Sequence, residues 1–144
     1  MDSHISAPAG NTYGQLINGA IHWFSDWSTT DVPRSGAVVY TIWNRQGSFI
    51  YVGMSGRSFT GGAEGNGKAG PWGRLNSHAS GRRSGDQFCV YVADRLVLPT
   101  LHNRIPEIAD GTLSLDVATR DYIRTNLEHR TGRQIQQVSG WAEI

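Results

Sequence analysis

The sequence predicts a single α+β domain, and three features carry this prediction. Val38–Trp43 and Phe49–Val52 are rich in β-branched and aromatic residues, which suit a pleated, half-buried surface. The polar segment between them contains Gly47, as expected for the loop of a β-hairpin. Pro71–Ser80 and Ser114–Arg130 instead have the start and stop signals of helices. We therefore expect a small three-stranded sheet, mixed or antiparallel, flanked by helices.

The first 35 residues are predicted to form an N-terminal extension, and residues 36–144 the main domain. Within the extension, Gln15–Trp27 has apolar residues at mixed three- and four-residue spacing. This spacing favours a short amphipathic helix, although Gly19 weakens the prediction.

The main domain continues after the hairpin with further predicted elements. In Pro71–Ser80 the proline stands near the first turn, where a helix tolerates it, and Gly81 follows as a natural stop. Gln87–Ala93 is continuously apolar, which predicts a third, central strand. Ser114 is a plausible N-cap for the helix that extends to about Arg130. Gln134–Val138 alternates as a further strand would.

Length and composition limit the classes of protein that remain. The 144 residues are enough for one domain, and 38% hydrophobic with 17% charged residues fits a globular protein. No apolar run approaches the roughly 18 residues that a membrane span needs. The N-terminus lacks a basic-then-apolar signal pattern, so a cytoplasmic location is expected. One cysteine and five dispersed histidines do not build a structural zinc site, and the sequence has neither a Walker loop nor a Gly-x-Ser-x-Gly motif.

The distribution of charged residues gives limited support for nucleic-acid binding. The net charge is only +1, but Lys68, Arg74, Arg82 and Arg83 form a local basic cluster that is suited to phosphates. A solvated basic face would have the same composition, so this cluster does not decide between the two.

Four residues form a candidate catalytic constellation. Tyr40 and Tyr51 lie on the two strands of the predicted hairpin, and Arg74 and His78 lie four residues apart, on one face of the next helix. Each pair alone also fits ordinary packing or a solvated helix face. The Gly-rich segment between the pairs and the basic cluster after them favour a shared site.

These residues resemble the core of the GIY-YIG nuclease family. Val38-Val39-Tyr40 and Tyr51-Val52-Gly53 are similar to its two signature triplets, and Arg74 follows on the next helix. His78 is similar to the Arg-x-x-x-His form found in restriction-type branches. The resemblance covers most of residues 36–93 and implies a β-β-α-β core.

The resemblance implies a DNA endonuclease that hydrolyses phosphodiester bonds. In this reading Tyr40 accepts the proton of the attacking water, and Arg74 holds the phosphate and lowers the pKa of that phenol from its usual value near 10. Tyr51 orients the phosphate or the water, and His78 positions Tyr40 or shares in proton transfer. Arg57 lies where the family often has a basic residue near the DNA backbone.

The resemblance also implies one divalent ion, Mg²⁺ or Mn²⁺, held by a carboxylate. The family takes this carboxylate from a glutamate on a helix after the third strand. Asp121 is the first choice here, with Glu128 and Glu143 as alternatives. A solvated Asp121 that pairs with a neighbouring arginine is equally compatible with the sequence.

The sequence is also compatible with two other functions. A module that kept the fold and lost the metal-binding acid would bind nucleic acid without cutting it. A regulatory or toxin-like protein would bind another protein, for which the five tryptophans offer an interface. The sequence does not specify the oligomeric state, nor whether the DNA is single- or double-stranded.

Overall fold

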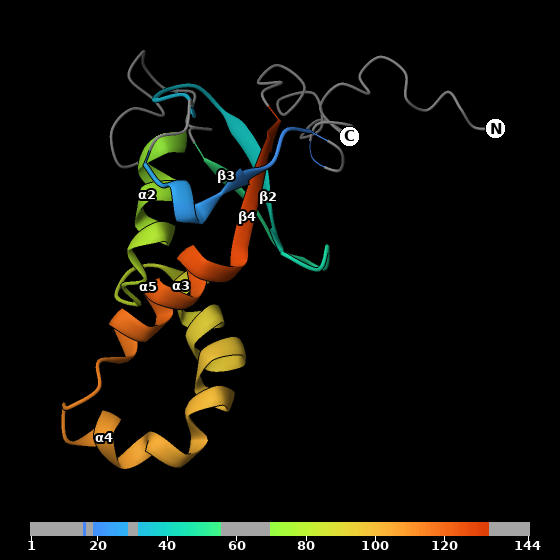
Figure 1. Cartoon of the computed structure of the whole chain (residues 1–144). Coiled ribbons are helices and arrows are strands. Elements are labelled where there is room, and N and C mark those ends of the chain that lie inside the picture. The colour runs from blue at the N-terminus through green and yellow to red at the C-terminus, as the bar shows by residue number, and fades with distance from the viewer. Residues whose placement is uncertain (1–15, 17–18, 29–31, 56–69, 133–144) are drawn as a thin grey trace, which may run out of the picture.

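The structure is a computed structural model that describes residues 16, 19–28, 32–55 and 70–132. Its centre is a four-stranded antiparallel sheet with strand order β1-β4-β2-β3. Figure 1 shows the helices on one side of this sheet. The α+β fold that the sequence predicts is confirmed. Two of the four strands, however, form in segments for which the sequence predicts helices.

The predicted hairpin is confirmed as β2 (Val38–Asn44) and β3 (Phe49–Ser55). Gly47 adopts φ 86°, a left-handed conformation that glycine adopts without a Cβ penalty. The Asn44 side chain accepts hydrogen bonds from the backbone N–H groups of Gln46 and Ser48, which closes the turn. Tyr40 pairs with Gly53 across the two strands.

The helix after the hairpin is also confirmed, as α2 (Pro71–Ser80). Pro71 stands in its first turn, where the missing N–H costs no hydrogen bond. Gly81 ends the helix in the left-handed conformation, with φ 73°. Leu75 and His78 point from α2 into the protein and are buried.

The third strand predicted over Gln87–Ala93 is wrong. This segment forms α3 (Gln87–Val92), and the π-helical turn η5 (Ala93–Val97) continues it. Asp86 caps α3, because its Oδ1 accepts a hydrogen bond from the backbone N–H of Cys89 at 3.0 Å. A short, continuously apolar run fits a buried helix as well as a central strand, so periodicity alone did not decide between them.

The helix predicted from Ser114 to Arg130 is confirmed only in part. Ser114 caps α5 (Leu115–Asn126), and the chain then becomes β4 (Leu127–Gly132). β4 lies between β1 and β2 in the sheet, and its residues 127–129 are buried. Backbone pairing and burial in the sheet therefore override the helical pattern at the end of this segment. The strand predicted over Gln134–Val138 lies outside the described residues.

The helix predicted over Gln15–Trp27 is wrong for residues 19–27, although Leu16 is helical and residues 15, 17 and 18 lie outside the described residues. His22–Trp23 forms the short strand β1, and Phe24–Asp26 forms the 3₁₀ turn η3. β1 pairs with β4, and Phe24 is completely buried in the core. This part of the predicted extension thus contributes a strand and a core residue to the same domain.

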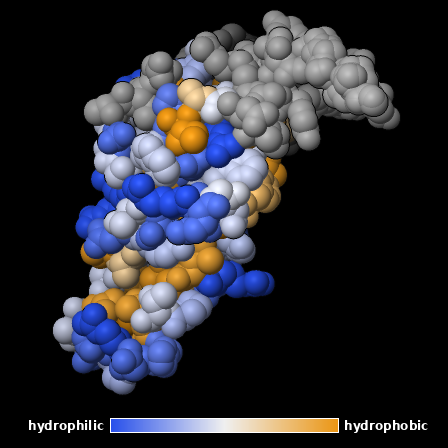
Figure 2. Space-filling model, turned by 45° about the vertical axis from the view of Figure 1, so that its right-hand side comes forward, coloured by the Kyte–Doolittle hydropathy of each residue, from blue (hydrophilic) through white to orange (hydrophobic). Residues whose placement is uncertain are grey.

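Between η5 and α5 the chain forms η6 (Leu98–Arg104) and α4 (Ile105–Ala109). Figure 1 shows these elements extending away from the sheet, with α4 at the lower end. Apolar side chains gather on the lower part of the surface in Figure 2, and Ile105 is among the exposed large hydrophobic residues. No helix in the described part of the chain is long and apolar enough to span a membrane.

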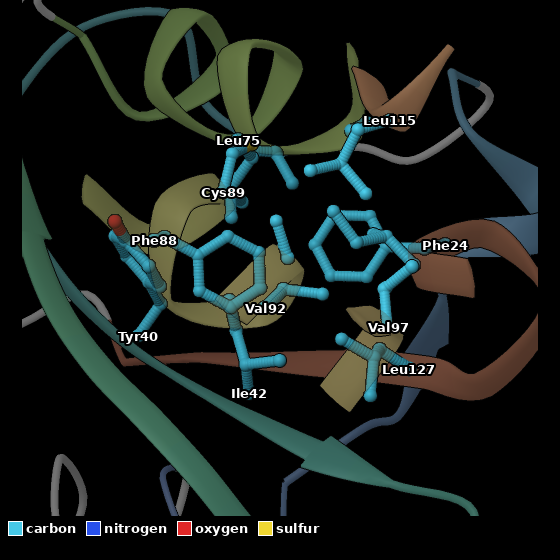
Figure 3. Packing of buried hydrophobic residues seen from close by; sticks show 14 residues of the cluster. Phe24, Tyr40, Ile42, Leu75, Phe88, Cys89, Val92, Val97, Leu115 and Leu127 are labelled. Atoms are coloured by element: carbon cyan, nitrogen blue, oxygen red, sulfur yellow. The ribbon is translucent and has the colours of Figure 1, made fainter. Parts of the chain in front are cut away.

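The core lies between the sheet and the helices, as Figure 3 shows. Ile42 from β2 packs with Phe88 and Val92 from α3, and Phe24 closes the opposite side. Tyr40 stands at one edge of this cluster, and its hydroxyl oxygen points away from Ile42 toward α2. Packing of β2 against α2 and α3 therefore brings a polar atom of the sheet to the inner face of a helix.

Candidate active site

Tyr40 is held at the site by the sheet beneath it. Its side chain is only 1% exposed, and its ring lies across Gly53, its partner on β3. A Cβ at position 53 would fall far inside van der Waals contact with Cζ and Oη of Tyr40. The position of the Tyr40 ring therefore requires a glycine at position 53.

The Tyr40 hydroxyl forms a hydrogen bond with His78, which lies on the helix α2. The Oη of Tyr40 lies 2.8 Å from Nε2 of His78, and both side chains are buried. The other ring nitrogen, Nδ1, lies 2.8 Å from Oδ2 of Asp86. Since a carboxylate only accepts hydrogen bonds, Nδ1 carries the hydrogen, and in the neutral imidazole Nε2 accepts the Tyr40 O–H. The three side chains form a continuous Tyr40–His78–Asp86 relay.

Asp86 is the charged end of this relay. Burial opposes its ionisation, but the hydrogen bond and electrostatic attraction of the His78 ring outweigh it, with help from Ser77 and Cys89, and lower the pKa of Asp86 to about 2. The Ser77 hydroxyl donates to Oδ2 at 2.6 Å. Asp86 is therefore a carboxylate at neutral pH, and its position is fixed by the start of α3 as well as by His78.

The acidity of Tyr40 differs from the sequence-based expectation. Burial raises the pKa of Tyr40 well above 10, and the neighbouring Tyr51 raises it further. Arg74 lowers this pKa, as expected, but its effect is smaller than that of burial. Tyr40 is thus a neutral phenol at physiological pH, and His78 rather than Arg74 is the group placed to take its proton.

Tyr51 and Arg74 complete the cluster toward solvent. The Tyr51 ring stands edge-on to His78, with ring centroids 5.8 Å apart, and it packs against Phe88 at 5.0 Å. Burial raises the pKa of Tyr51, and Arg74 acts in the opposite direction on both tyrosines. Tyr51 is partly buried and Arg74 is exposed. The structure therefore brings together all four residues predicted as catalytic.

The two predicted metal ligands that the structure describes, Asp121 and Glu128, do not join this cluster. The Asp121 carboxylate is 64% exposed and pairs with Arg120 at 3.2 Å. Glu128 pairs with Trp43 across the sheet, and Trp43 alternates with Ile42, so Glu128 lies on the sheet face opposite to Tyr40. There it forms an ion pair with Arg130 at 2.8 Å. Glu143 lies outside the described residues.

The predicted DNA-binding arginines separate into two kinds. Arg82 lines a cavity along α2 together with Arg74. Arg83 is instead bound to Asp116, with Nε 2.6 Å from Oδ1. Arg57 and Lys68 lie outside the described residues.

Sequence reasoning missed Asp86 and Ser77. Ser77 precedes His78, and its role depends on a contact with α3 that no sequence spacing indicates. Asp86 did carry a signal, because an aspartate directly before an apolar run is a common N-cap of a helix. A helical reading of Gln87–Val92 would have placed this carboxylate at a helix start rather than inside a strand.

The chain matches no protein-family model, and comparisons with curated proteins and with solved structures find no match either. The likeness to GIY-YIG nucleases therefore rests on the residues described above.

Proposed function

We propose that this protein is an endonuclease of the GIY-YIG type that hydrolyses phosphodiester bonds in DNA. The observation that carries the proposal is the Tyr40–His78–Asp86 relay, with 2.8 Å at each of its two histidine contacts. A buried tyrosine whose proton has a histidine acceptor, and a histidine oriented by a carboxylate, follow the logic of an activated nucleophile–base pair. Arg74 and Tyr51 lie beside this relay on its solvent side.

In the proposed reaction Tyr40 transfers a proton to His78 as it accepts one from water, so it is not deprotonated beforehand. As water attacks phosphorus and the P–O bond to the leaving group breaks, a water proton moves to Oη of Tyr40. The phenol proton moves at the same time to Nε2 of His78, and Asp86 stabilises the imidazolium that forms. The proton then returns through Tyr40 to the leaving oxygen. This path requires no tyrosinate, in agreement with the raised pKa of Tyr40.

Arg74 is the residue proposed to bind the scissile phosphate. A guanidinium binds phosphate oxygens through paired N–H donors, and it stabilises charge that develops in the transition state. Arg74 acts to lower the pKa of both tyrosines, and in this proposal one phosphate contacts Arg74 and Tyr51 together.

A divalent ion would stabilise charge on the phosphate and the leaving oxygen. The described acidic residues do not fit it, because Asp86 is engaged by His78 and Ser77, and no cluster of three possible ligands occurs among them. Glu143, the remaining carboxylate that the resemblance suggests, lies outside the described residues.

Plasmid cleavage tests the proposal. Purified protein is incubated with plasmid and with single-stranded DNA, in Mg²⁺, in Mn²⁺ and in excess chelator, beside Tyr40→Phe and Arg74→Ala. We expect the wild type to cut and each variant to lose about a hundredfold or more in rate. Tyr40→Phe keeps the ring in the core, so its melting temperature controls for folding. A wild type that cuts no DNA, or two variants that cut as fast as the wild type, would refute the endonuclease.

A second candidate is a module that binds nucleic acid without cutting it. The observation that favours it is the burial of Tyr40, which is 1% exposed although the mechanism needs its hydroxyl to meet water. This candidate predicts salt-dependent DNA binding in the same protein preparation, with no cleavage under any metal condition.

A further inference from the structure

A polar cavity of about 410 Å³ runs along the outer side of α2 and the turn that follows it. It is lined by two arginines, one amide and several serines, namely Arg74, Arg82, Asn76, Ser77, Ser80 and Ser84. No acidic side chain of the described residues lines it. The volume falls within the range of roughly 300–1,000 Å³ that is typical of ligand sites.

Arg74 and Arg82 differ from the other arginines that the structure describes. Neither guanidinium has a hydrogen bond, ion pair or ring contact with another described side chain, although Arg82 is close enough to Asp116 to affect its pKa. The remaining arginines of the described ranges all have such contacts, to carboxylates, carbonyl oxygens or aromatic rings: Arg34, Arg45, Arg83, Arg95, Arg104, Arg120, Arg124 and Arg130. The two arginines without such partners both line this one cavity.

The neighbouring polar groups add donors rather than negative charge. Trp27 donates its indole N–H to Oδ1 of Asn76 at 2.7 Å, which fixes the amide and leaves its NH₂ group to face another acceptor. The Ser84 hydroxyl has no hydrogen bond to a described residue. Ser80 is engaged, because it donates to the carbonyl of Ser77 and accepts from the N–H of Arg82. The cavity therefore offers guanidinium, amide and hydroxyl donors to an anion.

Two features connect this cavity to the relay. Arg74 lines the cavity and also acts on Tyr40 and Tyr51. Ser77 lines the cavity and donates to Asp86. An anion in the cavity thus lies next to the residues proposed to cleave the phosphodiester bond.

We propose that this cavity binds a backbone phosphate of the polynucleotide, next to the phosphate that is cleaved. Arg82, the Asn76 amide and the Ser84 hydroxyl hold this second phosphate, and Arg74 stands between it and the scissile one. This inference rests on the proposed function, and it assigns to Arg82 a role that Arg83, bound to Asp116, does not share. Paired donors on a phosphate fix the register of the strand without reading its sequence.

Binding without cleavage tests this assignment. Anisotropy of a short fluorescein-labelled DNA is measured in excess chelator, over a series of salt concentrations, for the wild type, Arg82→Gln and Asn76→Asp. The charge-matched control is Arg95→Gln, because Arg95 does not line the cavity and its guanidinium lies over the ring of Tyr91. We expect Arg82→Gln to weaken binding about tenfold and to reduce the salt slope by about one, and Arg95→Gln to stay within about twofold of the wild type.

Asn76→Asp provides a second, nearly isosteric variant. Its carboxylate still accepts from Trp27, but it puts a negative charge where the amide donor was, so it should weaken binding at least as much as Arg82→Gln. Equal affinity in Arg82→Gln and Arg95→Gln, or unchanged affinity in both cavity variants, would overturn the proposal.

Inorganic phosphate distinguishes the polynucleotide from a free anion. If phosphate binds in an Arg82-dependent manner while DNA affinity does not depend on Arg82, the cavity is a site for small anions and the backbone assignment is wrong. If DNA affinity depends on Arg82 but the wild type cuts no DNA, the cavity assignment holds and the endonuclease proposal fails.

Discussion

The hydroxyl of Tyr40 lies 2.8 Å from Nε2 of His78, although 38 positions separate the two residues in the chain. Tyr40 comes from the strand β2 and His78 from the helix α2, and the core packing of Figure 3 holds the two elements together. Asp86, at the start of α3, fixes the far side of the imidazole. Three separate elements thus meet at one hydrogen-bonded relay, and each of them offers a way to test it.

Asp86→Asn should separate the relay from the fold. Asparagine also caps helices well, so the N-cap of α3 is retained. An amide nitrogen in place of Oδ2 would favour the imidazole tautomer with hydrogen on Nε2, which no longer accepts the Tyr40 proton. We expect DNA cleavage to fall by about a hundredfold to ten-thousandfold, with far-UV circular dichroism unchanged. Cleavage at the wild-type rate would show that the carboxylate of Asp86 has no part in the reaction.

Gly53→Ala should displace the Tyr40 ring. The new Cβ would overlap Cζ and Oη of Tyr40, and the flexible side chain moves more easily than the strand. We expect the Tyr40–His78 hydrogen bond to break and cleavage to fall nearly as far as in Tyr40→Phe. Gly111→Ala is the control, because Gly111 has φ 85° with open space around it. Its backbone strain lowers stability by about 1 kcal/mol and leaves cleavage unchanged.

Because His129 is buried, we expect the free energy of unfolding to decrease in acid. It is completely buried, neither ring nitrogen has a hydrogen-bond partner among the described residues, and its ring stacks on His22. Burial, with smaller effects of His22 and His78, lowers its pKa to about 3. The unfolded chain binds this proton near pH 6.5 and the folded protein does not, so stability is complete above pH 6.5 and falls as the pH drops toward 3.

Urea unfolding at pH 8 and pH 5 measures this effect. The wild type should lose about 2 kcal/mol between the two, as one histidine with this pKa requires. His129→Leu replaces the ring with an apolar side chain beside Phe24 and should remove most of that loss. Below pH 4, protonation of Asp86 destabilises both proteins further, because its pKa is lowered in the folded state. An equal loss in the wild type and in His129→Leu would assign the acid sensitivity to other groups.

The acidic residues Asp121 and Glu128 should affect stability and not cleavage. Asp121→Ala removes an exposed pair with Arg120 and should cost less than about 1 kcal/mol. Glu128→Ala leaves Arg130 without its carboxylate partner on the outer sheet face and should cost about 1 to 3 kcal/mol. Both variants should cut DNA as fast as the wild type. A specific loss of cleavage in either one would return that residue to the list of metal ligands.

Local signals in the sequence determined the hairpin, α2 and the beginning of α5. Each of these signals affects the backbone only within a few residues of its own position. They are the aromatic and β-branched runs, the turn around Gly47, the Pro71 start and Gly81 stop of α2, and the Ser114 cap. The same local pattern placed Arg74 and His78 on one helix after the two tyrosines. Candidate residues on these elements were therefore predictable from the chain alone.

Only the tertiary structure decided where the remaining strands lie and what completes the relay. Leu127–Gly132 becomes a strand because it pairs with β2 and β1. Gln87–Val92 becomes a helix whose Phe88 and Val92 pack against Ile42 of the sheet. Asp86 reaches His78 through that helix start, and Glu128 is turned to the other sheet face by its register with Trp43. The state of Tyr40 was decided in the same way, because its pKa depends on burial by side chains distant in the sequence. Contacts between distant segments set these features, and spacing along the chain does not specify such contacts.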